Sequence, residues 1–277
     1  MTSTAPALAL AIAGSEATGG AGAQADLKTF QELGVFGIVN LTCIVSFDPR
    51  DNWNHRFVPV DQQVIADQLE ATTAAYGAGS GATTVLETVK IGMLGSPATI
   101  TTVETALKGA GFKNVVLDPV LICKGQEPGH ALDTDQALKA QILPLATFVT
   151  PNHFEAESLS GMEIHNVGDL KAAARRIHGI SGAAVLAKGG VRLSGADAVD
   201  VFFDGETLEV LSAPKVGDVA VSGAGCSLAA AVTAELAKGA TPLEAARSAK
   251  AFVTEGIRNR VVSGAPFTAL WQGGAAG

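Results

Sequence analysis

A run of small residues, Ser222-Gly223-Ala224-Gly225-Cys226, leads directly into an apolar helical segment. The first N–H groups of a helix have no backbone partners and carry partial positive charge, so small side chains there let an anion approach the backbone. The same field is expected to lower the pKa of the Cys226 thiol towards neutrality, where a base is most useful. The pattern predicts an anion site with a basic cysteine. A glycine-softened helix start around a buried thiol is the alternative.

A second glycine cluster runs from Gly14 to Gly22, between an apolar run and a helical segment that contains Asp26. Open α/β sheets bind ligands at such loops, where a strand ends. The cluster has neither GxGxxG nor GxxxxGK[ST] spacing, and the next strand does not end in an acidic residue, which disfavours a Rossmann dehydrogenase and a P-loop phosphotransferase. We expect Gly14, Ser15 and Gly22 to lie near a nucleotide or substrate. A plain tight turn is the alternative.

Oxygen-bearing side chains follow two further apolar runs. Asp118 ends one run, and Asn152 and Glu155 follow the next. Mg²⁺ is usually held by one or two carboxylates together with water and substrate phosphates, so these residues suit magnesium. Asn152 and Glu155 could equally cap the next helix. Lys188, followed by two glycines up to Gly190, adds a cation at the end of another run.

Composition excludes several other classes of protein. The formal net charge of -8 makes the chain a poor match to nucleic acid. Cys43, Cys123 and Cys226 are widely spaced, and no histidine pair has HxxxH spacing, so we expect reduced thiols, no disulfide scaffold and no zinc site. No apolar stretch is long enough to span a membrane, and no basic residue precedes the first apolar run, which indicates a cytoplasmic protein.

The elements that must position these residues alternate along the chain. Short Val/Ile/Leu-rich runs alternate with longer Ala-rich segments of helical period, as in a parallel sheet covered by helices. Strands are expected at 8–13, 37–45, 84–91, 114–118, 147–150 and 183–187. Asp204-Gly205 predicts the turn of an antiparallel hairpin over 198–210. Thr241-Pro242 and Glu244 predict the start of a helix. Without a linker in the sequence, we expect one doubly wound α/β domain over 1–277.

With these motifs in chain order, the sequence resembles the ribokinase-type vitamin kinases, in the branch of hydroxymethylpyrimidine kinases and related bacterial pyridoxal kinases. The resemblance covers nearly the whole chain. It is carried by AIAGSEATGGAGAQADLKTFQELG, KIGMLG, VVLDPVLICKG, VTPNHFEAESLSG, AKGG and SGAGCSLAAAVTAELAKGATPLEAARSAKAFV. GAGC lies where other ribokinase-like kinases carry a catalytic aspartate, and ICKG lies on the lid segment. The sequence is therefore similar to the two-cysteine type of pyridoxal kinase.

This resemblance implies a ribokinase-like fold, with a mostly parallel central sheet, helices on both faces and a small β-hairpin at one edge. Cys226 would be the catalytic base, and Cys123 would lie on a lid at about 122–132. One of the two thiols could hold the aldehyde of pyridoxal as a hemithioacetal. The residues that would form the backbone anion hole are Gly223, Ala224 and Gly225.

The resemblance also implies binding roles. The residues expected near the substrate are Gly14, Ser15, Gly22, Asp26, Phe47 and Met93. Those expected near the ATP phosphates are Asn152, Lys188, Gly190, Gly223 and Gly225, and those expected near Mg²⁺ are Asp118 and Glu155. The sequence leaves open whether a monovalent cation is also required.

Three positions depart from the family pattern. Glu16 stands where aspartate is expected, and Ser222 stands where the cysteine-type kinases usually have histidine. At Phe47, pyrimidine kinases tend to carry a glutamine that binds the polar edge of the pyrimidine, whereas pyridoxal kinases tend to be apolar. Phe47 therefore favours pyridoxal as the substrate.

The function that the resemblance implies is an ATP-dependent pyridoxal kinase. It would phosphorylate the 5′-hydroxymethyl group of pyridoxal, and possible further substrates are pyridoxine and pyridoxamine. The resemblance implies a homodimer with a small-molecule substrate. A hydroxymethylpyrimidine/phosphomethylpyrimidine kinase of thiamine biosynthesis, or a bifunctional enzyme, is the alternative. A non-catalytic protein that binds a vitamin or nucleotide is the alternative from another class, although such a protein needs no base aimed at an anion hole.

Overall fold

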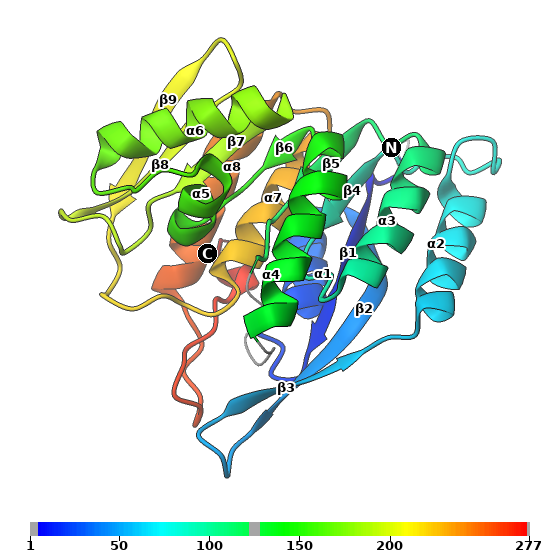
Figure 1. Cartoon of the computed structure of the whole chain (residues 1–277), viewed down its shortest axis with the longest axis horizontal. Coiled ribbons are helices and arrows are strands. Elements are labelled where there is room, and N and C mark those ends of the chain that lie inside the picture. The colour runs from blue at the N-terminus through cyan, green and yellow to red at the C-terminus, as the bar shows by residue number, and fades with distance from the viewer. Residues whose placement is uncertain (1–4, 122–127, 276–277) are drawn as a thin grey trace.

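A computed structural model describes residues 5–121 and 128–275. In this part of the chain the strands form a nine-stranded sheet in the order β3-β2-β1-β4-β5-β6-β7-β8-β9 (Figure 1). The strands are β1 Leu8–Glu16, β2 Phe36–Asp48, β3 Asn54–Pro59, β4 Thr88–Ile91, β5 Asn114–Leu117, β6 Phe148–Val149, β7 Ala184–Lys188, β8 Asp197–Phe203 and β9 Leu208–Pro214. Six neighbouring strands of the sheet are parallel, namely β2, β1, β4, β5, β6 and β7. The remaining strands, β3, β8 and β9, are antiparallel to their neighbours. The predicted mostly parallel sheet is confirmed.

The hairpin at one edge of the sheet is also where the sequence predicted it. Strands β8 and β9 pair from Asp197 to Phe203, and Gly205 lies in the turn with a φ of 102°. The carboxylate of Asp204 accepts hydrogen bonds from the N–H groups of Glu206 and Thr207. A short polar side chain followed by glycine therefore closes the turn, as the sequence signal requires.

Three of the predicted strands differ from the structure by three or more residues in length. The expected strand at 84–91 begins only at Thr88, because residues 83–87 form bends and irregular backbone. Strand β1 continues through the glycine motif to Glu16, after a register shift between Ala13 and Ser15. Strand β2 continues to Asp48 and turns back into β3, which was not predicted. The turn places Asn52 and Trp53 at positive φ without a glycine, so it carried no recognisable turn signal.

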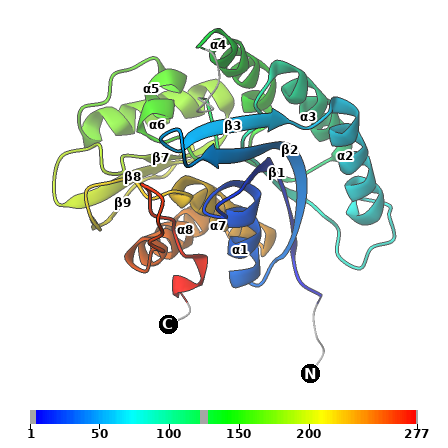
Figure 2. The same cartoon turned by 90° about the horizontal axis from the view of Figure 1, so that it is seen from below.

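The helices cover both faces of the sheet. Their bounds are α1 Gly22–Glu32, α2 Gln62–Tyr76, α3 Pro97–Ala110, α4 Pro128–Ala137, α5 His153–Ser160, α6 Val167–Ser181, α7 Ala224–Ala237 and α8 Pro242–Arg258. Figure 2 shows α1, α7 and α8 on one face and α2, α3, α4, α5 and α6 on the other. None of the helices in the described part of the chain is both long and apolar enough to cross a membrane.

Helix α7 is the central helix of its layer. Its residues from Ser227 to Ala234 are all buried, because it lies between the sheet and its neighbours α1 and α8. An all-round apolar helix of this kind is held firmly by packing rather than by one amphipathic face. The next helix, α8, starts as predicted with Thr241 at the N-cap, Pro242 in the first turn and a reciprocal bond from Glu244. These two helices fix the position of the glycine loop that precedes α7.

The predicted lid at about 122–132 is only partly covered by the structure. Residues 122–127, which include Cys123, lie outside the described residues. From residue 128 the chain is helical and forms α4.

Candidate active site

The two glycine loops that the sequence singled out meet at the edge of the sheet where the parallel strands end. Segment 14–22 contains the end of β1 and the turn after it, and segment 222–226 leads into α7. Gly223 is the N-cap of α7 with a φ of 76°, and a Cβ atom placed on it would collide with the carbonyl oxygen of Gly20. Both the backbone conformation and the contact require glycine at this position. Gly223, Ala224 and Gly225 are partly exposed, so an anion can reach the first N–H groups of α7.

Lys188 places its ammonium group beside this helix start. It lies at the end of β7, and its Nζ is 3.5 Å from the position that a Cβ atom on Gly225 would take. The same Nζ is 3.4 Å from Oδ1 of Asp118. Nearby Asp118 and Glu155 raise the pKa of Lys188 against the opposing effect of burial. The side chain therefore stays a cation, and it adds to the positive field at the first turn of α7.

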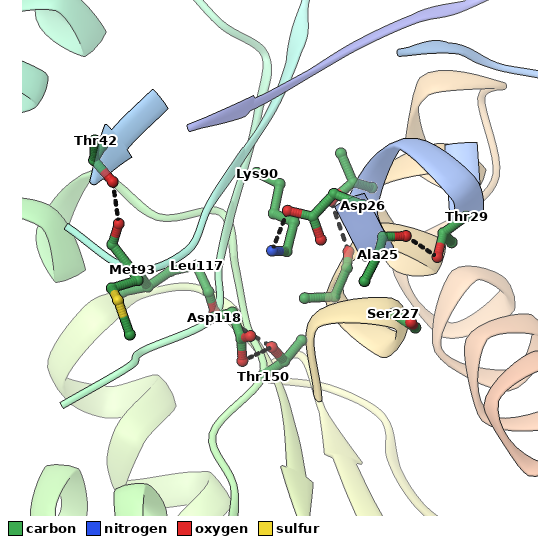
Figure 3. A network of polar contacts seen from close by, with 12 residues as sticks. Ala25, Asp26, Thr29, Thr42, Lys90, Met93, Leu117, Asp118, Thr150 and Ser227 are labelled. Atoms are coloured by element: carbon green, nitrogen blue, oxygen red, sulfur yellow. Dashed lines mark hydrogen bonds and ion pairs between the residues drawn. The ribbon is translucent and has the colours of Figure 1, made fainter. Parts of the chain in front are cut away.

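Asp118 and Glu155 lie close enough to interact electrostatically, each after its own strand. Asp118 follows β5 and accepts a hydrogen bond from Thr150 at 3.3 Å (Figure 3). Glu155 and Asn152 form a reciprocal capping box at the start of α5, so the capping role considered for both residues is confirmed. Capping uses Oε2 of Glu155 and Oδ1 of Asn152, and it leaves Oε1 and Nδ2 for other partners.

The two carboxylates fit a divalent cation. Burial, and to a lesser extent the charge of Asp118, raises the pKa of Glu155 to about 8, although Lys188 lowers it. A cation between two mutually repelling, poorly hydrated carboxylates would relieve this cost, and oxygen donors are those that Mg²⁺ prefers. The described residues contain no group of three or more His, Cys, Asp or Glu side chains that could hold a metal. A metal here would therefore need oxygens from a bound phosphate as well.

Cys226 lies in the first turn of α7. Burial raises the pKa of its thiol to about 11, while Lys90 and the Gly22 N–H act in the opposite direction. The predicted shift towards neutrality is therefore wrong for this structure. The helix argument counted the field of α7 but not the loss of water around the sulfur, which costs the thiolate more.

This pKa has a direct chemical consequence. Between pH 7 and 10, alkylation of Cys226 by iodoacetamide is expected to speed up about tenfold per pH unit, because the thiolate fraction rises by that factor below the pKa. Quenched samples analysed by peptide mass spectrometry separate Cys226 from Cys43, which is fully buried. A rate that levels off near pH 7 to 8 would contradict the raised pKa.

Glu16, which departs from the family pattern, organises the first glycine loop. Its carboxylate accepts hydrogen bonds from the N–H groups of Thr18, Gly20 and Ala21 at 2.7, 3.0 and 3.1 Å. The loop is thereby held in the shape that brings Gly20 against Gly223. Ser15 is fixed separately, because its hydroxyl accepts a hydrogen bond from Gln24 at 2.8 Å. The longer side chain of Glu16 therefore has a structural role at this edge of the sheet.

An aromatic cluster lies on the arm formed by β2 and β3. The ring of Phe47 is 4.7 Å from His55, 5.2 Å from Phe267 and 6.3 Å from Trp53, measured between centroids. Phe47 is only partly buried. The cluster joins the arm to the C-terminal segment, so Phe47 belongs to an apolar surface that flat rings can contact. Sequence reasoning missed Trp53, His55 and Phe267, which lie in segments without a motif.

Met93 and Cys43 complete the floor near Gly14. The sulfur atoms of Met93 and Cys43 are 3.6 Å apart, and the Met93 sulfur is also 3.6 Å from the position of a Cβ atom on Gly14. The hydroxyl of Thr42 donates to the carbonyl oxygen of Met93 at 2.6 Å, which fixes this residue just beyond β4. Cys43 is a core residue, as predicted.

Comparison with known proteins places this geometry in a family. The profile of the phosphomethylpyrimidine kinase family matches residues 16–270. The chain belongs to this family. Pyridoxine kinase of Bacillus subtilis is 46% identical over 255 residues, which cover 90% of each chain.

Two solved structures resemble this member of the phosphomethylpyrimidine kinase family over nearly its whole length. An ADP complex of Bacillus subtilis pyridoxal kinase matches with a TM-score of 0.89 and 43% identity, covering 98% of this chain and 99% of that one. A complex of Staphylococcus aureus pyridoxal kinase with AMP-PCP and pyridoxal matches with a TM-score of 0.88 and 36% identity, covering 98% and 95%. The predicted ribokinase-like fold is confirmed, and the chain is a phosphotransferase with an alcohol group as acceptor.

In a kinase of this family, Lys188 is expected to act on the transferred phosphate. Replacing Lys188 with methionine should raise the KM for ATP and lower kcat about a hundredfold, because a preorganised charge next to the helix start is lost. Steady-state kinetics measure both values. Lys113→Met is the matched control, since Lys113 is exposed, pairs with Glu87 and lies at the opposite edge of the sheet. Equal kinetics in the two variants would contradict this role.

Proposed function

We propose that this protein is an ATP-dependent pyridoxal kinase that phosphorylates the 5′-hydroxymethyl group of pyridoxal in vitamin B6 salvage. The observation that carries the proposal is the start of α7, where Cys226, the Gly223–Gly225 backbone and Lys188 lie together. Similarity to pyridoxine and pyridoxal kinases supports the choice of substrate, and similarity to structures that hold ADP and AMP-PCP supports ATP as the donor.

The geometry supports phosphoryl transfer by positioning and charge stabilisation. The substrate hydroxyl oxygen forms a bond to the γ-phosphorus, the bond from that phosphorus to the bridging oxygen breaks, and ADP leaves. The hydroxyl proton passes to Cys226 in its thiolate form, and the resulting thiol then returns this proton to solvent. The N–H groups at Gly223 to Gly225 and the ammonium of Lys188 stabilise the charge on the transferring group. Asp118 and Glu155 would hold Mg²⁺, which neutralises phosphate charge when bound.

The residues near the substrate follow from the same edge of the sheet. Gly14, Gly22 and Met93 form the side next to β1, and Phe47 offers an apolar surface. Asp26, which was expected to contact the substrate ring, has no accessible surface and is bound to Lys90. In this conformation Asp26 cannot contact a substrate directly, so any effect of Asp26 on the substrate must act through neighbouring residues.

Cys123 stays part of the proposal on sequence grounds. Its thiol would add across the aldehyde of pyridoxal, so that a sulfur–carbon bond forms and the thiol proton moves to the aldehyde oxygen. Cys123→Ala is then expected to lower kcat/KM for pyridoxal about tenfold, roughly the value of one lost specific contact. Pyridoxine, which has an alcohol in place of the aldehyde, is the matched substrate and should be unaffected. An equal loss for both substrates would contradict the hemithioacetal.

The deciding experiment compares substrates in a coupled ADP-release assay with Mg·ATP. Pyridoxal, pyridoxine and hydroxymethylpyrimidine are compared by kcat/KM, which reports differential transition-state binding. We expect pyridoxal to be preferred. A preference for hydroxymethylpyrimidine would make this a kinase of thiamine biosynthesis, in keeping with the name of the family. Binding without turnover of any substrate would contradict the proposed activity.

We further propose that the enzyme is a cytoplasmic homodimer. The acidic, cysteine-poor composition supports a reducing compartment, and the family resemblance supports the dimer. Light scattering after size-exclusion chromatography measures the dimer directly, with an expected mass of twice 28.0 kDa.

A further inference from the structure

The most deeply buried ion pair of the described residues lies below the active site. Nζ of Lys90, on β4, is 2.9 Å from Oδ2 of Asp26, on α1, and both side chains have no accessible surface. The other carboxylate oxygen, Oδ1 of Asp26, has no hydrogen-bond partner among the described residues. Figure 3 shows the two side chains facing each other, from the strand and the helix.

Stability does not explain this pair. Removing two charges from water costs several kcal/mol per ion, and their attraction offsets this cost only when every remaining polar atom is also satisfied. Oδ1 of Asp26 is not satisfied in this way. Well-packed apolar residues in the place of a buried ion pair often stabilise a fold equally well or better. The pair therefore calls for a role in the chemistry of the site.

The pair joins β4 to α1, and both elements contact α7, the helix that carries Cys226. Nζ of Lys90 is 3.2 Å from the position of a Cβ atom on Gly92, so its side chain runs along β4 towards the edge where the active site lies. Asp26 lies one turn after Gly22 on α1. The residue before α1 touches the start of α7, since a Cβ atom placed on Gly223 would lie 3.5 Å from Cα of Ala21. Helix α7 packs against both α1 and β4.

We propose that Lys90 and Asp26 form a positioning pair whose ammonium group stabilises negative charge on the Cys226 sulfur. The inference rests on the proposed function, in which Cys226 accepts the hydroxyl proton. Lys90 acts through Cys226 and does not touch the substrate. Asp26 holds the ammonium in place and keeps Lys90 protonated inside the protein.

The charges around the thiol favour this role. Lys90 on β4 attracts negative charge on the sulfur, whereas Asp118 after β5 and Asp26 on α1 repel it. Lys188 reaches the first turn of α7 from β7. Lys90 has the largest effect on the thiol of the charges that act on it, and the effect of Asp26 is smaller. The pair has no net charge, but the attraction from Lys90 exceeds the repulsion from Asp26 at the Cys226 sulfur, so the pair favours the thiolate.

Three variants test the pair: Lys90→Met, Asp26→Asn and the double variant K90M/D26N. The readout is the pH dependence of Cys226 alkylation, measured by peptide mass spectrometry without substrate. At pH 8, Asp26→Asn should react about tenfold faster than the natural chain, because an unopposed ammonium lowers the thiol pKa by about one unit. Lys90→Met should react about tenfold slower. The double variant should also react more slowly than the natural chain, with kcat reduced in proportion and the KM for ATP unchanged.

The matched control is another well-buried pair, Lys250 and Asp200, whose Nζ and Oδ2 are 2.8 Å apart. K250M/D200N should lower thermal stability by a comparable amount and leave the alkylation profile of Cys226 unchanged. If Lys90 and Asp26 have only a structural role, K90M/D26N should likewise lose thermal stability and keep the natural alkylation profile of Cys226. That result would overturn the inference.

Two further outcomes are decisive. If Lys90→Met and the double variant do not fold, Asp26→Asn, which preserves shape, still tests the pair: an unchanged or slower alkylation rate would overturn the inference. The alkylation profile needs no substrate, so a protein that fails to phosphorylate pyridoxal but shows the expected profile would disprove the proposed function and not the role of the pair.

Discussion

Cys226→Ala and Cys226→Ser are each expected to lower kcat about 10²- to 10⁴-fold, the range for loss of a general base. The thiol is the titratable group that the first turn of α7 presents beside the anion hole, and a serine hydroxyl is far less acidic. The KM for ATP should change little, because the phosphates contact the backbone of α7 and Lys188. Steady-state kinetics with pyridoxal at several pH values measure the effect.

The control for these variants is their thermal unfolding. The residue Cys226 keeps some accessible surface at the start of α7, and alanine and serine are close to cysteine in size. Either change should therefore alter the free energy of unfolding by no more than about 1 kcal/mol. A kcat within fivefold of the natural chain in both variants would remove Cys226 as the base. Retained activity with serine but not with alanine would show that a neutral hydroxyl can relay the proton.

Gly223→Ala is expected to abolish measurable turnover, a loss of at least about 10³-fold in kcat/KM. The new Cβ atom would collide with the carbonyl oxygen of Gly20, and the residue would have to keep a φ of 76°. The collision is with backbone rather than with a flexible side chain, so either the start of α7 or loop 14–22 must move. Both movements displace the N–H groups that bind the transferring phosphate.

Gly239→Ala is the control for Gly223→Ala. It introduces the backbone strain of a positive φ without the collision of the new Cβ atom. Gly239 also has a positive φ, of 92°, but a Cβ atom there would meet no atom within 4 Å. This variant should lose about 1 kcal/mol of stability and keep its activity, since only the left-handed conformation is penalised. Similar kinetics for Gly223→Ala and Gly239→Ala would show that the close contact between the loops is not needed for catalysis.

Much of the fold was predictable because its signals are local. The parallel strands are short buried runs, the β8–β9 turn carries Asp204-Gly205, and α8 carries a capping box. The arm of β2 and β3 was missed, because Asn52 and Trp53 make a left-handed turn that is unusual without glycine. A polar strand such as β3, at an edge and largely exposed, gives little periodic signal.

The site was predictable where a motif carried it and not where distant residues meet. Glycines, Asp118, Glu155 and Lys188 end strands or begin helices, so topology brings them to one edge. Lys90 and Asp26 are 64 positions apart, and a lysine inside a short strand is ordinarily taken to face solvent. The pKa of Cys226 depends on how much water the fold removes, which no sequence pattern reveals.

The contact between Gly20 and Gly223 joins the first loop of the chain to a helix that begins some two hundred residues later, and Ser222 is fixed in turn by backbone bonds to Thr268 and Leu270. During synthesis, the start of α7 can take up all of these contacts only after residue 270 has left the ribosome. Closing so long a loop is slow, although it adds little to the thermodynamic cost. All nine strands of the described sheet precede residue 215, so a nascent chain can complete its sheet before the contacts at the start of α7 are in place.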